Sequence, residues 1–276
     1  MVNVINSYLR FHARHNWRGL QPLLKLFRGG NLPPLIRTRT CDGLWLDVDP
    51  NNYMDQFILN EGYYEREVLD ALVPFIDNDT VLWDVGANIG LHSITAKHLF
   101  PSMRVVCFEP SPYNFVRLYT NAKLNSCDMA LMNVALSDHS GYENLSVNIY
   151  GHHGVTSLRP WSHVKYEFSY SCRCETGKAL LNQKVIPIPT IIKIDVENLE
   201  YEVLLGFQDL LEDSTLRAVI FEDQSSDKKG SAAYSLLESK GFFISELAPF
   251  NKDEKQEVTN FLAQRGAVSD CSTLLA

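Results

Sequence analysis

The stretch from Val81 to Ile94, VLWDVGANIGLHSI, constrains the fold more than any other part of this sequence. An apolar run typical of a buried strand leads straight into a turn that contains Gly86 and Gly90, and the pattern of a helix follows. Glycine allows the backbone to turn tightly and allows a helix to approach a ligand or a sheet closely. This order of elements predicts an α/β fold that holds a polar or negatively charged group against its backbone.

Strand and helix patterns alternate along most of the chain. After the turn come a helix, a second strand, a second helix and a third strand, and the alternation resumes after a polar break. The segments are LHSITAKHLF, RVVCFEP, SPYNFVRLYTNAKLN and MALMNVAL, and then TIIKIDV, NLEYEVLLGFQDLL, LRAVIFED, AAYSLLESKG, FFISEL and EVTNFLA. Such alternation predicts a mostly parallel sheet covered by helices on both faces.

The same patterns divide the chain into three parts. Residues 1–42 form a basic arm that we expect to be helical. Residues 43–79 contain a predicted strand, GLWLDVDP, and a predicted helix from Asp55 to Phe75, which we expect to pack on the core. Residues 80–276 form the core, with an aperiodic insertion at about 150–183 that we expect to be a substrate loop.

Charge is divided unevenly between the arm and the rest of the chain. From Met1 to Cys41 there are seven Lys and Arg residues and no acid, whereas the rest carries 18 bases and 33 acids. The acidic main domain argues against nucleic acid as a partner. The arm can touch an anionic membrane surface or pack as a solvated helix on the main domain, and we favour the second interpretation.

Neither a membrane span nor a metal site is expected. No apolar run reaches the roughly 18 to 20 residues that cross a bilayer, and the N-terminus lacks the pattern of a signal peptide. We therefore expect a cytoplasmic protein, peripheral to the membrane at most. The six cysteines show no spacing typical of zinc ligands. Asp195 and Glu197 with Asn198 offer an alternative as ligands of Mg²⁺, but we expect no metal.

Polar residues stand where the first three core strands end, which is where open α/β sheets bind ligands. Asp84 indicates a ligand with an amine, Glu109 can accept both hydroxyls of a ribose, and a base edge can bond to Ser137 and Asp138. Amine, ribose and base together describe S-adenosylmethionine. The spacing D-x-G-x-x-x-G departs from the G-x-G-x-x-G dinucleotide pattern, which makes a nicotinamide oxidoreductase the weakest candidate.

Four segments carry a resemblance to a known family: VLWDVGANIGLHS, CFEPSPYNFVRLYTNAKLN, NVALSDHSG and IIKIDVENLEYEVLLG. From about Leu44 to Ala263 the chain resembles the FkbM-type methyltransferases, S-adenosylmethionine-dependent enzymes that mostly methylate hydroxyls of sugars and other secondary metabolites. The resemblance implies a Rossmann-like, seven-stranded class I methyltransferase fold. It also implies a cofactor site made of Asp84, Gly86, Asn88 and Gly90, with Glu109 and Pro110 at the ribose and Ser137 and Asp138 near adenine.

Candidate catalytic residues lie on the acceptor side. Lys193, Asp195 and Glu197 alternate at the end of a predicted strand and so share a face. They form either a charge cluster that neutralises itself, or a site in which Asp195 and Glu197 orient or deprotonate the acceptor hydroxyl. His153, in the polar break, is a third candidate base. Glu222 ends another predicted strand and is placed to face the same cleft.

Two departures from the family pattern lie on this side as well. Asn198 stands where the family usually has glycine, and asparagine tolerates left-handed backbone better than other residues. The connection 184–192 is shorter than is usual in the family.

We predict an S-adenosylmethionine-dependent O-methyltransferase that acts on a hydroxyl of a sugar, a glycan-like molecule or a secondary metabolite. One alternative is N-methylation of a small molecule or peptide. Another is a degenerate cofactor-binding module without turnover, for which the two departures are the reason. The identity of the acceptor and the oligomeric state are not encoded in these patterns.

Overall fold

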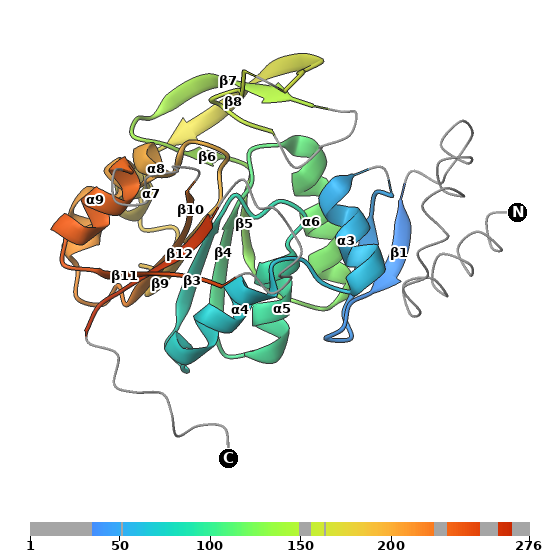
Figure 1. Ribbon diagram of the computed structural model, residues 1–276, viewed down its shortest axis with the longest axis horizontal. Helices are drawn as coiled ribbons and strands as arrows, with labels where there is room; N and C mark the ends of the chain where they lie inside the picture. The colour runs from blue at the N-terminus through green and yellow to red at the C-terminus, as the bar shows by residue number, and fades with distance from the viewer. Residues whose placement is uncertain are drawn as a thin grey trace, which may run out of the picture.

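The computed structural model describes residues 35–50, 52–148, 156–162, 164–223, 231–248 and 259–266 (Figure 1). His153 and most of the basic arm 1–42 lie outside the described residues, so their predicted roles stay predictions. Within the described ranges, no helix combines the length and the apolar character needed to cross a membrane.

A seven-stranded sheet in the order β11-β12-β10-β9-β3-β4-β5 forms the centre of the molecule. Neighbouring strands are parallel from β10 through β5, whereas β12 is antiparallel to both β10 and β11. The strand order reverses between β9 and β3, which makes this the switch point where open sheets bind ligands. The predicted seven-stranded class I methyltransferase fold is thereby confirmed. The strands are β3 (Val81–Val85), β4 (Arg104–Phe108), β5 (Ala130–Met132), β9 (Ile191–Ile194), β10 (Ala218–Asp223), β11 (Phe243–Glu246) and β12 (Thr259–Gln264).

Each face of the sheet carries its own apolar core, because alternate residues of a strand point to opposite sides. Leu82 and Cys107 pack in one core, while Trp83 and Phe108, their direct neighbours in the chain, pack in the other. Helices therefore cover both faces, as predicted (Figure 1). The first face has α3 (Tyr53–Glu61), α4 (Arg66–Leu72), α5 (Leu91–Leu99) and α6 (Pro112–Leu124), and the second has α7 (Gly177–Asn182), α8 (Glu200–Phe207) and α9 (Ala232–Ser239).

The segment before the core forms a hairpin followed by helices. Strand β1 (Ile36–Arg39) pairs antiparallel with β2 (Trp45–Val48), so the expected helical arm 1–42 is wrong for its last residues. The single helix predicted from Asp55 to Phe75 is also wrong. It divides into α3, α4 and the 3₁₀ turn η1 (Val73–Phe75), because Gly62 ends α3 in a left-handed conformation.

A second, three-stranded sheet lies beyond the carboxyl ends of the large one (Figure 1). It consists of β6 (Ala135–Leu136), β8 (Phe168–Glu175) and β7 (Gly141–Val147) in that order. The insertion predicted as aperiodic at about 150–183 is thus partly regular, since it contains β8 and α7. The sequence of β8 concealed its pattern because the residues buried on one face include two cysteines, Cys172 and Cys174, rather than larger apolar residues.

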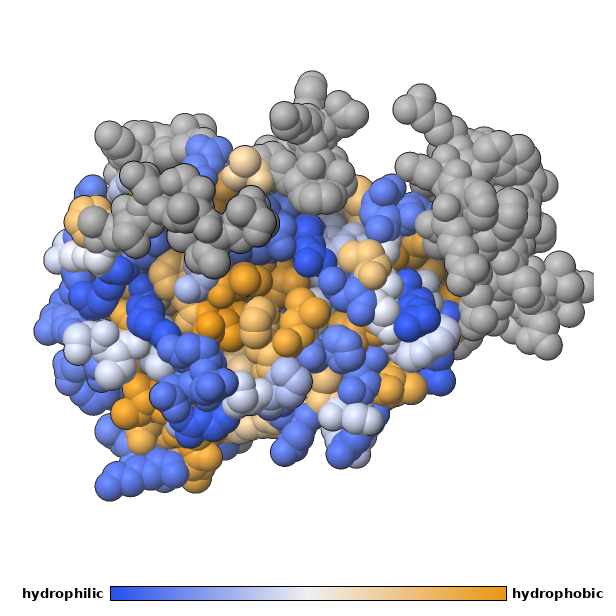
Figure 2. Space-filling view, turned by 90° about the horizontal axis from the view of Figure 1, so that it is seen from below, coloured by the Kyte–Doolittle hydropathy of each residue, from blue (hydrophilic) through white to orange (hydrophobic). Residues whose placement is uncertain are grey.

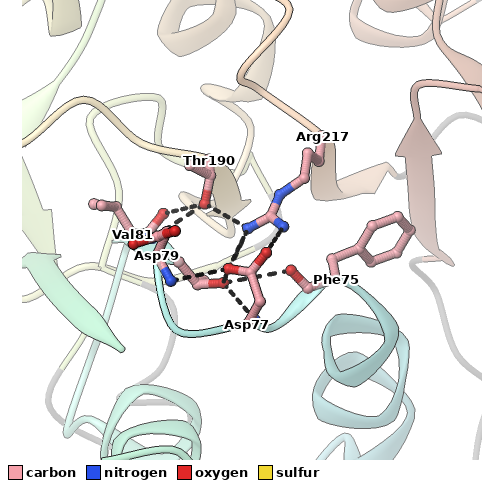
Figure 3. Close-up of polar contacts among 7 residues, drawn as sticks. Phe75, Asp77, Asp79, Val81, Thr190 and Arg217 are labelled. Atoms are coloured by element: carbon pink, nitrogen blue, oxygen red, sulfur yellow. Dashed lines mark hydrogen bonds and ion pairs between the residues drawn. The ribbon is translucent and has the colours of Figure 1, made fainter. Parts of the chain in front are cut away.

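Polar bonds secure the opposite end of the large sheet. The guanidinium of Arg217 pairs with Asp77 at 2.5 Å and donates to the hydroxyls of Thr80 and Thr190 at 2.9 and 3.1 Å (Figure 3). Arg217 lowers the pKa of Asp77 to about 2 through this bond. Seen from below, this end shows apolar residues at its centre with hydrophilic residues around them (Figure 2). The opposite, carboxyl end of the sheet faces β6, β7 and β8 (Figure 1).

Candidate active site

A cavity opens at the carboxyl ends of the large sheet, between that sheet and the small one. It encloses about 810 Å³ of space including the part open to solvent. Its walls come from residues at or just after the ends of β3, β4, β9 and β10, from β6 and β7, and from α3 and the turn before α4. Of the predicted site residues it includes Gly86, Asn88, Glu109, Pro110, Asp195 and Glu197, and also Glu222.

The turn after β3 is tight enough to require glycine. Gly86 has φ of 79°, and a Cβ atom there would lie 1.8 Å from the carbonyl oxygen of Asp195. Gly90 has φ of 87°, and a Cβ there would lie 2.4 Å from the side chain of Leu118. Gly86 therefore lets the turn approach the end of β9 at the cavity, whereas Gly90 lets α5 pack against α6.

Asn88 lies in the same turn and is one of the residues that line the cavity. Its backbone is left-handed, with φ of 50°. Its side-chain oxygen is buried and has no hydrogen-bond partner among the described residues. A buried acceptor without a partner is unfavourable unless a ligand or water satisfies it. The turn therefore offers one free acceptor to a donor group in the cavity.

Glu109 joins the two loops that follow β3 and β4. One carboxylate oxygen accepts the backbone N–H of Asn88 and the other that of Ser111, both at 2.8 Å. Burial raises the pKa of Glu109 to about 7, although these two N–H groups favour the charged form. Each carboxylate oxygen has a second lone pair, so the predicted contact with two ribose hydroxyls fits this geometry and stays a prediction.

Asp84 lies behind the cavity wall rather than in it. The side chain is almost fully buried, accepts a bond from Ser93 of α5, and pairs with the ammonium of Lys193 at 3.2 Å. It is not among the residues that line the cavity. Its predicted contact with the amine of the cofactor stays a prediction, and its observed partner is Lys193.

Ser137 and Asp138 also lie away from the cavity. Ser137 is fully buried and its N–H donates to the carbonyl of Glu175 at 3.0 Å. Asp138 is exposed and bonds to His139, which lowers the pKa of Asp138. The residues just before them, Ala135 and Leu136, do line the cavity, together with Phe108, Val134, Leu145, Leu158 and Leu199. This apolar wall suits a flat aromatic base.

Besides Glu109, four carboxylates line the cavity: Glu65, Asp195, Glu197 and Glu222. No lysine or arginine is among the described residues that line it. Burial, and then the charge of Asp195, raises the pKa of Glu65 to about 8, and burial raises the pKa of Glu197 and of Glu222 well above the usual range. Burial and crowding of this kind favour the protonated forms of Glu65, Glu197 and Glu222.

Sequence patterns did not identify Glu65, nor its cavity neighbours Met54, Tyr64 and Asn114. Glu65 sits in a left-handed conformation in the break between α3 and α4, which the predicted continuous helix concealed. Its position depends on how α4 packs against β10, and no local pattern reports that contact.

The chain turns sharply after β9. Glu197 and Asn198 both have left-handed backbone, with φ of 58° and 76°. Asn198 therefore adopts the conformation for which glycine is favoured. The hydroxyl of Ser157 donates a hydrogen bond to the carbonyl of Glu197 at 2.6 Å. Within the described residues, no group of acids, cysteines and histidines has an arrangement that would hold a metal ion.

Comparisons with known proteins point to one family. Residues 84–266 match the methyltransferase FkbM domain. Hexuronic acid methyltransferase AglP of Haloferax volcanii is 30% identical over 193 residues, which cover 69% of this chain and 74% of the relative. The 31-O-demethyl-FK506 methyltransferase FkbM of Streptomyces tacrolimicus is 25% identical over 215 residues, covering 68% and 82%. The solved structure of precorrin-6y C5,15-methyltransferase from Geobacter metallireducens matches with a TM-score of 0.47 at 16% identity, covering 73% of this chain and 87% of that one.

Proposed function

The chain belongs to the FkbM family of S-adenosylmethionine-dependent methyltransferases, and from this premise we propose that it methylates a hydroxyl of a sugar or glycan-like acceptor. Two relatives support the acceptor class by their names, one a hexuronic acid methyltransferase and the other a 31-O-demethyl-FK506 methyltransferase. The contact of the basic arm with a membrane and the cytoplasmic location remain proposals.

The cavity offers what this cofactor requires. The apolar wall suits adenine, Glu109 suits the ribose, and the free side-chain oxygen of Asn88 suits the amine. When bound, S-adenosylmethionine supplies a methyl group on a positively charged sulfur. The carbonyl of Asp195 comes so close to Gly86 that the acceptor side and the cofactor turn are held as one unit.

The observation that carries the proposal is the carboxylate of Asp195 at the end of β9. Asp195 lies beside the cofactor turn and lines the cavity. Methyl transfer to a hydroxyl depends mostly on alignment of the reacting atoms, with modest help from a base. A carboxylate in this place can hold the acceptor hydroxyl and accept its proton. The four acids also favour a second candidate, N-methylation of an amine that binds as an ammonium.

Incubation with S-adenosylmethionine and a panel of acceptors tests the proposal. The panel contains a neutral glycoside, a uronic acid glycoside and an amino sugar, and the methylated position is read by mass spectrometry and NMR. We expect an O-methyl product, with the neutral or amino sugar preferred because no lysine or arginine among the described residues that line the cavity could pair with a uronate. Exclusive N-methylation would establish the second candidate. Binding of S-adenosylhomocysteine without transfer to any acceptor would favour a module without turnover.

Cofactor affinity should depend on the protonation of Glu109. Ribose hydroxyls donate to a carboxylate and so favour its charged form. The pKa of the Glu109 carboxyl is about 7. Below that pH a proton must leave before binding, and we expect the affinity for S-adenosylhomocysteine to fall by up to about tenfold per pH unit. Calorimetry across this range measures the slope. Glu109→Gln should show weaker binding with a flat profile, and a flat profile in the unaltered protein would contradict the prediction.

A further inference from the structure

Lys193 joins two carboxylates of different character. Its ammonium lies 3.2 Å from an oxygen of Asp84 and 3.2 Å from an oxygen of Asp195. The side chains of Lys193 and Asp84 are 4% and 1% exposed, whereas that of Asp195 is 34% exposed and lines the cavity. One side of the ammonium is therefore anchored in the core, and the other side faces the reaction site.

The anchor is itself fixed. Ser93, from the first turn of α5, donates to the second oxygen of Asp84, so both oxygens of Asp84 are occupied. Asp84 on β3 lies directly opposite Lys193 on β9 in the parallel pair. The ammonium consequently has one rigid partner, and it donates a second bond to Asp195.

The backbone of Asp195 is also held in place. Its N–H donates to the carbonyl of Val85 at 3.0 Å, and its carbonyl packs against Gly86. Only the side-chain torsions of Asp195 remain to be set, and the bond from Lys193 sets them. A buried second partner that orients a reacting group is the usual means of keeping such a group within a productive geometry.

We propose that Lys193 is a positioning residue, anchored by Asp84, that aims the Asp195 carboxylate at the acceptor hydroxyl. The proposal rests on the proposed O-methyl transfer. In that reaction the acceptor oxygen forms a bond to the methyl carbon and the carbon–sulfur bond breaks, its electron pair going to sulfur. The hydroxyl proton passes to Asp195, so charge and atoms balance.

The surrounding charges show why Asp195 needs this partner. Titratable groups from every neighbouring element surround Asp195. They are Tyr64 and Glu65 before α4, His92 of α5, Asp84 of β3, Glu109 after β4, Glu197 and Glu200 after β9, and Glu222 of β10. Burial lowers the pKa of His92 to about 4, so it brings no positive charge at neutral pH. Burial alone would lower the pKa of Lys193, but Asp195, Asp84 and Glu65 outweigh this and raise it. Lys193 is therefore the cation that offsets the charge of Asp195.

Turnover of paired variants tests the role of Lys193. Removing the ammonium alone would leave Asp84 buried without a counter-charge, so the comparison is made in the Asp84→Asn background. There we expect Lys193→Met to lower kcat by about 100-fold, the usual contribution of a positioned base. We expect Lys193→Arg in the same background to have a kcat at least about tenfold higher than Lys193→Met, since arginine keeps the positive charge. The KM for S-adenosylmethionine should stay within about threefold. Equal losses in both variants would overturn the proposal.

A second background separates positioning from a general structural effect. If Lys193 acts through Asp195, adding Lys193→Met to an Asp84→Asn/Asp195→Asn protein should lower kcat by less than about threefold further, because the two changes share one effect. A further loss as large as that in the Asp84→Asn background would show that Lys193 supports the fold instead, and would overturn the proposal.

An acceptor-free measurement keeps the inference apart from the proposed function. Nitrogen-15 NMR of the lysine side chains, with the Lys193 signal assigned by its absence in the methionine variant, reports the charge of the ammonium. We expect that signal to show a charged Lys193 ammonium at about pH 10.5, where half of the molecules of an ordinary lysine are neutral. A neutral Lys193 at that pH would overturn the proposal whatever the acceptor. A charged Lys193 in a protein that methylates no hydroxyl would instead mean that the proposed function fails while the ion pair stands.

Discussion

Gly86→Ala is expected to abolish binding of S-adenosylhomocysteine and to destabilise the fold by more than about 2 kcal/mol. The new Cβ would lie 1.8 Å from the carbonyl oxygen of Asp195. A backbone atom at the end of a central strand has little room to move, so the turn and β9 must separate. This separation displaces Asn88 in the turn and Asp195 after β9, both of which line the cavity. Calorimetric titration and urea unfolding measure the two effects.

Gly241→Ala is the matched control. Gly241 has nearly the same backbone angle, φ of 81° against 79° for Gly86, but nothing lies within 4 Å of its Cβ position. Its substitution therefore isolates the strain of a left-handed alanine, about 1 to 2 kcal/mol, and should leave cofactor binding unchanged. If the two substitutions destabilise the protein equally, the close approach of Gly86 to Asp195 is not what makes glycine necessary.

Arg117→Met should lower the free energy of unfolding by about 3 to 5 kcal/mol. Arg117 of α6 pairs with Asp55 of α3, and their side chains are 3% and 0% exposed. Burial raises the pKa of Asp55 even with the arginine present. Without it, the carboxylate is left buried and charged, or must take up a proton to fold. The loss should therefore shrink as the pH falls, because the neutral acid needs no partner.

Arg37→Met provides the comparison for this pair. Arg37 pairs with Asp47 at 2.8 Å, but its side chain is 49% exposed, and solvent screening leaves such pairs worth less than about 1 kcal/mol. Urea unfolding of both variants at neutral and acidic pH gives the two differences. A smaller loss for Arg117→Met than for Arg37→Met would mean that the buried pair does not secure α3 to α6.

The cavity shows where prediction from sequence succeeded and where it failed. Gly86 and Glu109 were placed correctly at the carboxyl ends of β3 and β4, because strand, turn and helix patterns are local. Asp84 was expected to bind the cofactor amine from its position alone, and that contact stays a prediction; its observed partner, Lys193, lies 109 positions along the chain. Ser137 was expected near the adenine base. The predicted third strand, however, ends at Met132 as β5, and the residues that follow join the three-stranded sheet as β6.

The sequence by itself determined the order of strands and helices, the tight turn at Gly86 and the family to which the chain belongs. These follow from apolar periodicity and from the few residue types that particular backbone angles allow. Only the tertiary structure decided which charges meet. Pairing of β3 with β9 brought Lys193 between Asp84 and Asp195, and the break between α3 and α4 brought Glu65 to the cavity. Such contacts arise from packing between segments far apart in the chain, and a local pattern carries no record of them.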